Sequence, residues 1–237
     1  MAKQKKKGKW ITKLLIAVIM TYLLLIVLQL MGDVYSKLTF THKIPISKEW
    51  NLIVVNRWNE IPEDYSVELV ELSNGQRVDS RIYPYLQEMF DAARAEGVYP
   101  IVREGYRTEE EQQETLDEKI QAYIKEGYSR SRAEKTAKEW VALPGTSEHQ
   151  LGIAVDINAD KSKCSNEEVY AWLAENAYKY GFTLRYPLGK QEITGTSYEP
   201  WHYRYVGVKA AQEIYEKGIC LEEYIDKHFT SLYNINE

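Results

Sequence analysis

Residues 147–157 read SEHQLGIAVDI and join a polar segment to a short run of alternating side chains. The run predicts a β-strand over residues 153–157, in which the three branched aliphatic residues share one face. That face suits a hydrophobic core, while Ala154 and Asp156 lie on the opposite face. A carboxylate beside a small residue on the open face of a strand is well placed to bind a ligand.

Gly152 marks a place where the chain can turn before this strand. His149 precedes Asp156 by seven residues, and in one unbroken strand the two side chains would lie on opposite faces. A glycine tolerates the backbone conformations that a tight turn requires. We therefore expect a turn at Gly152 to bring His149 over the same face as Asp156.

A second segment of similar chemistry follows downstream, where residues 199–204 read EPWHYR. Glu199 and His202 are three residues apart, so a straight strand would again place them on opposite faces. Pro200 biases Glu199 toward an extended conformation and allows a bend at this point. Each pair of side chains can therefore converge on one site, but only through a turn.

The residue types in these segments are typical of a zinc-dependent hydrolase. Two imidazoles and one carboxylate form a three-ligand zinc set that leaves a coordination position open for water. A further glutamate could take a proton from that water, and an arginine could stabilise the developing oxyanion. The candidates are His149, Asp156 and His202 as ligands, Glu199 as the base, and Arg107 of the GYRT segment at residues 105–108 for the oxyanion.

Each segment also has an ordinary explanation when it is considered alone. A single histidine is more often a surface or core residue than a metal ligand, and we interpret His42 and His228 in that way. Arg107 could be an ion-paired arginine near the start of a helix. The case for catalysis therefore depends on the combination of the three segments.

Periodicity in the rest of the chain indicates an α+β fold. Strand-like runs lie at residues 98–102, 153–157, 182–186 and 201–206. Helices are predicted from apolar spacing over residues 82–96 and from capping boxes at Thr108/Glu111, Ser131/Glu134 and Ser165/Glu168. Because the elements alternate without a regular βαβ rhythm, we expect a small, mostly antiparallel sheet with flanking helices.

Composition and charge exclude several classes of protein. With 44% hydrophobic and 27% charged residues, the chain of 237 residues is neither disordered, nor collagen-like, nor a polytopic membrane protein. Residues 1–13 hold six lysines, and the remaining 24 basic and 35 acidic residues leave a net charge near −11. An acidic body argues against a nucleic acid partner. Two cysteines exclude a disulfide-rich scaffold and a multi-cysteine zinc ribbon.

Residues 14–31 read LLIAVIMTYLLLIVLQLM and carry no charge. As a helix this run rises roughly 27 Å, close to the ~30 Å hydrocarbon core of a bilayer, so we expect a transmembrane anchor. The preceding lysines predict a cytoplasmic N-terminus and an extracytoplasmic remainder. The alternative is a cleaved signal peptide, but its apolar region should span only ~7–15 residues.

We therefore expect four parts along the chain. These are a basic cytoplasmic tail (1–13), a transmembrane anchor (14–31), a stalk that leads into the domain (32–60) and a single domain that carries the candidate zinc site (61–237). Cys164 and Cys220 both fall outside the membrane in this interpretation, where a disulfide is permitted. The sequence does not decide between a disulfide and two free thiols.

The combined motifs resemble those of the VanY-type D-alanyl-D-alanine carboxypeptidases. These zinc peptidases are related to D-Ala-D-Ala dipeptidases and, in fold, to the Hedgehog signalling domain. The similarity covers roughly residues 80–226 and is carried by SxHxxGxAxD at residues 147–156 and by ExWHxRYVG at residues 199–207. The GYRT segment, together with Gln112, resembles a further element of the family.

The resemblance implies a Hedgehog/DD-peptidase-like fold that holds Zn²⁺. By position it implies that His149, Asp156 and His202 bind zinc, that Glu199 is the general base, that Arg107 polarises the scissile carbonyl, and that Ser147 and Gln112 contact the substrate. The implied reaction is the hydrolysis, by metal-activated water, of the terminal D-alanine of peptidoglycan stem pentapeptides. Those peptides lie outside the membrane, where the predicted anchor places the domain.

Two other functions stay open at this point. Related enzymes with the same metal site are L,D-carboxypeptidases that act on tetrapeptide stems, and the sequence does not distinguish the two specificities. A non-catalytic, wall-binding module with a structural zinc is the third possibility. The presence of both Glu199 and Arg107 argues against such a module, because a structural zinc site needs neither.

Overall fold

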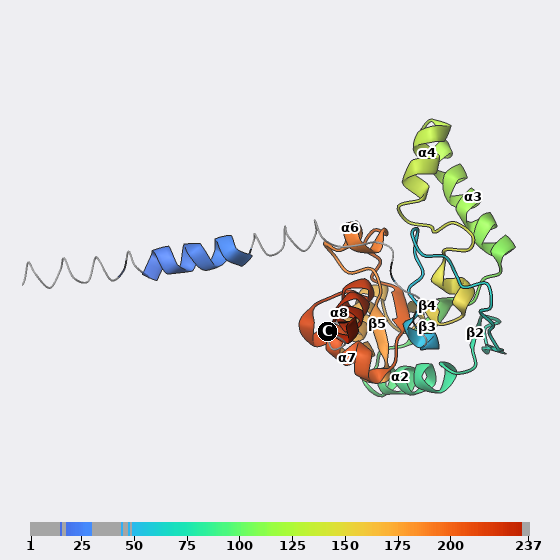
Figure 1. The fold of residues 1–237 in the computed structure, drawn as a ribbon. Coiled ribbons are helices and arrows are strands. Elements are labelled where there is room, and N and C mark those ends of the chain that lie inside the picture. Colours follow the sequence, from blue (N-terminus) through green and yellow to red (C-terminus); the bar gives the residue numbers. More distant parts are fainter. Residues whose placement is uncertain (1–14, 16–17, 30–43, 45–46, 48, 234–237) are drawn as a thin grey trace, which may run out of the picture. The chain divides into compact units, whose positions relative to one another are not determined.

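The computed structural model describes residues 15, 18–29, 44, 47 and 49–233. The chain divides into two compact units, residues 1–41 and 42–237. In the first unit, residues 18–29 form a helix with exposed side chains (Figure 1). The predicted anchor at residues 14–31 extends beyond the described residues at both ends. Within the described part of the chain, no helix is long and apolar enough to span a bilayer.

The second unit is built around a four-stranded antiparallel sheet in the order β3-β4-β6-β5. The strands are β3 (Pro100–Glu104), β4 (Ala154–Ala159), β5 (Phe182–Leu184) and β6 (His202–Tyr205). The predicted α+β class with a small antiparallel sheet is thereby confirmed. The structure adds a hairpin that the sequence did not predict, formed by β1 (Leu69–Glu71) and β2 (Arg77–Asp79).

The predicted start of β3 at residue 98 is wrong by two residues. The N–H of Val98 donates to Ala93 O, and Gly97 has a φ of +82°. These contacts end the preceding helix, so the chain becomes extended only afterwards.

Helices flank the sheet, as Figure 1 shows. They are α2 (Tyr83–Ala95), α3 (Glu109–Lys125), α4 (Arg130–Ala137), α5 (Asn166–Asn176), α6 (Gln191–Thr194), α7 (Val208–Lys217) and α8 (Leu221–Tyr233). Short 3-10 turns occur at η1 (Trp50–Leu52), η2 (Glu148–Leu151) and η3 (Ala177–Tyr180). The capping boxes predicted for α3 and α5 are both present.

The capping box predicted at Ser131 is wrong, because α4 begins two residues earlier than that cap requires and has Ser129 as its N-cap. Helices α3 and α4 pack against each other through a small hydrophobic cluster that includes Leu116, Ile120 and Ala133. The chain reverses at Gly127, which has a φ of +94°.

The hydrophobic core lies on one face of the sheet. Alternate side chains of β4 and β6 point into it, among them Val155, Ile157, Tyr203 and Tyr205, and helices α2 and α5 cover them. The predicted core face of β4 is therefore confirmed. The opposite face of β4 and β6 is left for polar side chains.

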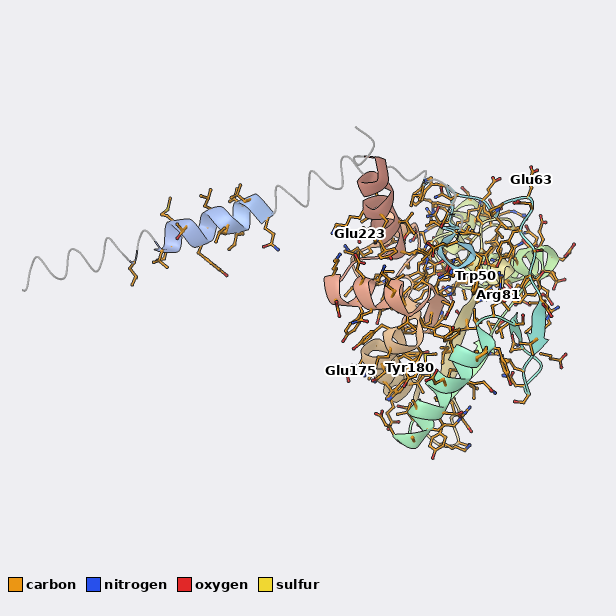
Figure 2. All side chains as sticks on the ribbon, turned by 60° about the horizontal axis from the view of Figure 1, so that its bottom comes forward. Trp50, Glu63, Arg81, Glu175, Tyr180 and Glu223 are labelled. Carbon is orange, nitrogen blue, oxygen red and sulfur yellow. The ribbon has the colours of Figure 1, made fainter. Side chains whose placement is uncertain are left out.

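Part of the predicted stalk belongs to the packed domain. Within residues 49–60, Ile53 and Val55 are buried in the core with the sheet. The guanidinium of Arg81, just before α2, lies 3.8 Å from the ring centroid of Trp50, and Figure 2 shows the two side by side. The last residues of the segment 32–60 therefore help to close the core.

Both cysteines are free thiols. Cys164 packs against the main core, where its Sγ accepts the Tyr99 N–H at 3.2 Å. Cys220 is buried just before α8. The choice that the sequence left open is thus decided in favour of two thiols.

Candidate metal centre

Strand register brings two of the predicted ligands together. In the antiparallel pair of β4 and β6, Asp156 lies directly opposite His202, and Ala154 lies opposite Arg204. The two side chains of such a pair lie on the same face of a sheet. His202 Nδ1 is 2.9 Å from Asp156 Oδ1. No special turn is needed for this contact, because the pairing alone produces it.

The third predicted ligand, His149, reaches the same face through the expected turn. Gly152 ends η2 with a φ of +73°, the left-handed conformation that glycine favours, and the chain then enters β4. His149 Nδ1 lies 2.7 Å from Gly105 O, so that nitrogen carries the proton and donates it to the carbonyl. The ring therefore presents Nε2 toward Asp156 Oδ1, at 3.5 Å.

Gly105 can hold His149 in this way because its backbone runs against β2. A Cβ atom at this position would lie 2.2 Å from Arg77 O, so no other residue fits without displacing the chain. The backbone N–H of Arg107 donates to His149 O at 3.2 Å, which is a second hydrogen bond between the GYRT segment and η2. The GYRT segment thus positions a ligand as well as supplying its own arginine.

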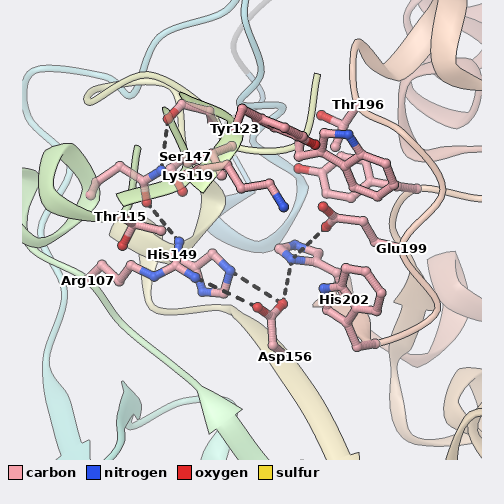
Figure 3. Close-up of a pocket in the computed structure, with 16 residues that line it drawn as sticks. Arg107, Thr115, Lys119, Tyr123, Ser147, His149, Asp156, Thr196, Glu199 and His202 are labelled. Atoms are coloured by element: carbon pink, nitrogen blue, oxygen red, sulfur yellow. Dashed lines mark hydrogen bonds and ion pairs between the residues drawn. The ribbon is translucent and has the colours of Figure 1, made fainter. Parts of the chain in front are cut away.

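The three side chains form a donor set that fits a zinc ion. One ligand atom from each of His149, Asp156 and His202 can be chosen so that all three lie within 4.8 Å of one another. Figure 3 shows the two rings and the carboxylate converging on one point. Two imidazole nitrogens and one carboxylate oxygen are a common ligand set of catalytic zinc.

The electrostatics of the site also favour a cation. Burial and the nearby Arg107 lower the pKa of His149 to about 4, which keeps this imidazole neutral and able to bind a metal. Burial alone would lower the pKa of His202, but the carboxylates of Asp156 and Glu148 raise it to about 9. Carboxylates thus outnumber cations around this ring. A divalent ion would replace the proton on His202 Nδ1 and balance their charge.

Glu199 and Arg107 line the same cavity. Glu199 Oε2 lies 3.8 Å from His202 Nδ1, and burial raises the pKa of Glu199 to about 8. The guanidinium of Arg107 lies 3.7 Å from Asp156 Oδ2 and donates to Gln112 Oε1 at 2.9 Å. All five side chains predicted to carry out the chemistry are therefore gathered at one site.

The two predicted substrate contacts also border this cavity, which measures about 320 Å³. Ser147 and Gln112 are both buried. The Gln112 amide accepts from Arg107 and donates to Ala142 O at 2.8 Å, so it also orients the arginine.

Sequence reasoning missed part of the cavity wall. One side of the cavity is lined by Lys119 and Tyr123 of α3 and by Trp140 in the turn after α4, and the Lys119 ammonium extends toward Glu199 in Figure 3. Lys119 and Tyr123 lie seven and eleven residues after Gln112, a helical spacing that places all three on one face of α3. That spacing was available in the sequence and could have identified them.

Comparisons with known proteins agree with this geometry. The family described as VanY, D-alanyl-D-alanine carboxypeptidase, matches residues 75–208. A D-alanyl-D-alanine carboxypeptidase of Enterococcus faecalis is 62% identical over 179 residues, which cover 76% of this chain and 67% of the relative.

Two solved structures are similar to this chain. A point mutant of the vancomycin-resistance D,D-pentapeptidase VanY from a VanB-type resistance cassette, in complex with Zn(II), is 63% identical, with a TM-score of 0.74, and the match covers 75% of this chain and 99% of that one. A VanYB structure in complex with D-alanine-D-alanine is 62% identical, also with a TM-score of 0.74, over 75% of this chain and 98% of that one.

We predict that His202→Ala abolishes stoichiometric zinc binding, because two protein ligands are too few to hold the ion. The measurement is the zinc content of the purified full-length chain after dialysis against zinc-free buffer. His228→Ala is the matched control, since this exposed imidazole on α8 faces Glu213 rather than the cavity. Full zinc occupancy in His202→Ala would remove His202 from the ligand set.

Proposed function

The chain belongs to the VanY family of D-alanyl-D-alanine carboxypeptidases, and we propose that it removes the terminal D-alanine from peptidoglycan stem pentapeptides. Family membership makes the protein a zinc-dependent enzyme. The observation that carries the proposal is the convergence of the ligand triad with Glu199 and Arg107 on one cavity. A cavity of about 320 Å³ is at the small end of the range for ligand sites, which suits the end of a peptide.

We assign the metal to His149 Nε2, Asp156 and His202 Nδ1. When bound there, zinc lowers the pKa of water and polarises a carbonyl group. Hydrogen bonding supports the choice of nitrogen on His149, because its Nδ1 is already engaged by Gly105. On His202 it is Nδ1 that faces Asp156 and Glu199.

Glu199 is assigned as the group that moves protons. Its buried carboxylate accepts a proton at an oxygen facing the cavity and returns it to the leaving amine. The raised pKa of about 8 makes both forms accessible near neutral pH. A nearby divalent cation favours the ionised form, which is the form that acts as a base.

Arg107 is assigned to the carbonyl oxygen of the scissile bond. Its guanidinium is held by Gln112 and approached by Asp156 and Glu104, so little reorganisation is needed when negative charge develops on that oxygen. Ser147 and Gln112 are assigned to contact the substrate from the same wall of the cavity.

We also propose that residues 14–31 anchor the enzyme in the cell membrane, with the N-terminus cytoplasmic and the domain outside. The support is the uncharged apolar run behind six lysines. The proposed substrate, peptidoglycan, lies on the same side of the membrane as the domain would.

The substrate proposal predicts a specific outcome in a paired assay. Purified protein should release D-alanine from a stem pentapeptide ending in D-Ala-D-Ala, and much more slowly from the corresponding tetrapeptide. A chelator should abolish the release, and added zinc should restore it. Faster release from the tetrapeptide would instead indicate an L,D-carboxypeptidase. Bound zinc without release from either peptide would favour a non-catalytic module.

For Glu199→Gln we predict normal zinc content and a turnover reduced by about 10²–10⁴-fold, because the amide cannot accept a proton. The measurement pairs metal analysis with D-alanine release under saturating pentapeptide. Glu175→Gln, on the exposed surface of α5 (Figure 2), makes the same chemical change away from the cavity and should leave turnover unchanged. Near-normal turnover in Glu199→Gln would exclude this residue as the base.

The anchor proposal predicts that the full-length chain sediments with membranes and resists extraction at alkaline pH. A chain that lacks residues 1–31 should instead be recovered in the soluble fraction. Recovery of the full-length chain in the soluble fraction, with its mass unchanged, would refute the anchor. Loss of the N-terminal segment from the full-length protein would identify a cleaved signal peptide.

A further inference from the structure

Four charged side chains form a buried cluster behind the metal centre. Glu148, Arg185, Arg204 and Glu222 come from η2, the segment after β5, β6 and α8, and each is at most 1% exposed. Arg185 donates through Nε to Glu148 Oε1 at 2.7 Å and through both Nη atoms to the two oxygens of Glu222, at 2.8 and 2.6 Å. Two negative and two positive charges thus balance within the cluster.

Glu148 differs from Glu222 in what its second oxygen faces. Its Oε1 accepts a hydrogen bond from Arg185 Nε at 2.7 Å and forms an ion pair with Arg204 Nη1 at 2.8 Å. Its Oε2 points instead toward His202 Nε2, at 3.8 Å. In the described part of the chain, neither Glu148 Oε2 nor His202 Nε2 has a hydrogen-bond partner. These are two buried polar atoms of complementary chemistry that face each other.

The two nitrogens of His202 therefore have different surroundings. Nδ1 faces Asp156 on the cavity side, and Nε2 faces Glu148 on the buried side. A histidine that binds a metal through one nitrogen carries its proton on the other, and a carboxylate that accepts this proton fixes the tautomer and the ring orientation. His149 already has such a partner in Gly105 O. Glu148 occupies the corresponding position for His202.

We propose that Glu148 is a positioning residue for the metal centre: its carboxylate accepts the Nε2–H of His202 and keeps Nδ1 free of a proton for zinc. The two arginines hold Glu148 Oε1 and so direct Oε2 at the ring. The cluster would then serve the metal centre as well as the packing of η2 against β6. If Glu148 only balanced the charge of the arginines, replacing it would affect zinc binding no more than replacing Glu222.

Glu148→Gln tests the proposal because the arginines dictate how the amide must lie. Arg185 and Arg204 are both donors, so the amide oxygen takes the Oε1 position between them. The NH₂ group then faces His202 Nε2 and favours a proton on Nδ1, where zinc should bind. We expect the zinc dissociation constant of the full-length chain to rise about 10–100-fold, measured by competition with a chromophoric chelator without substrate.

Glu222→Gln is the matched control. This substitution removes one negative charge from the same cluster, and that charge also pairs with Arg185. The side chains that Glu222 contacts, Arg185 and Asn56, lie outside the metal centre. We expect its zinc affinity to stay close to that of the unsubstituted chain. Equal losses of affinity in the two variants, or no loss in Glu148→Gln, would overturn the proposal.

A measurement on the unsubstituted chain covers the case in which either variant fails to fold. With ¹⁵N-labelled histidine and bound zinc, the nitrogen chemical shifts of His202 should show a protonated Nε2 and a zinc-bound Nδ1. A zinc-bound Nε2, or a Nδ1 that carries the proton, would refute the role of Glu148. Because both experiments monitor metal and no peptide is present, their failure is distinguishable from a failure of the proposed substrate.

Discussion

The pairing of β4 with β6 is the constraint on which the metal centre depends, because it sets Asp156 opposite His202. A slip of one residue would turn His202 toward the core and bring Tyr203 to the polar face. The core resists that slip, since Val155 and Tyr203 form the neighbouring pair and are both buried beneath α2 and α5. Hydrophobic packing on one face of the sheet therefore holds the register that assembles the chemistry on the other.

Several charged side chains are buried beside that polar face, and ion pairing limits the free energy that their burial costs. Removing one partner of a buried ion pair typically costs roughly 3–5 kcal/mol, because the other charge is left buried and unpaired. The buried cluster of Glu148, Arg185, Arg204 and Glu222 contains two negative and two positive charges, and each of them has an ion-pair partner. A metal that binds the folded chain and not the unfolded chain also stabilises the fold.

The cavity is assembled from segments that are far apart in the sequence. The candidate ligands come from η2, β4 and β6, while one wall is formed by Lys119 and Tyr123 of α3 and by Trp140 just after α4. The α3–α4 pair has a small hydrophobic cluster of its own, separate from the main core. This side of the cavity is therefore packed independently of the strands that carry Asp156 and His202.

The sequence was enough to predict the fold class, the capping boxes of α3 and α5, the core face of β4 and the residues of the candidate metal site. The first three follow from local periodicity and capping patterns, and the site residues follow from the combined motifs that resemble the VanY family. Four features required the tertiary structure: the strand register that sets Asp156 opposite His202, the hydrogen bond of Gly105 to the ring of His149, the free state of both thiols, and the approach of Glu148 to His202. Those contacts join residues whose separation in the sequence carries no information about their distance in space, so no local pattern could predict them.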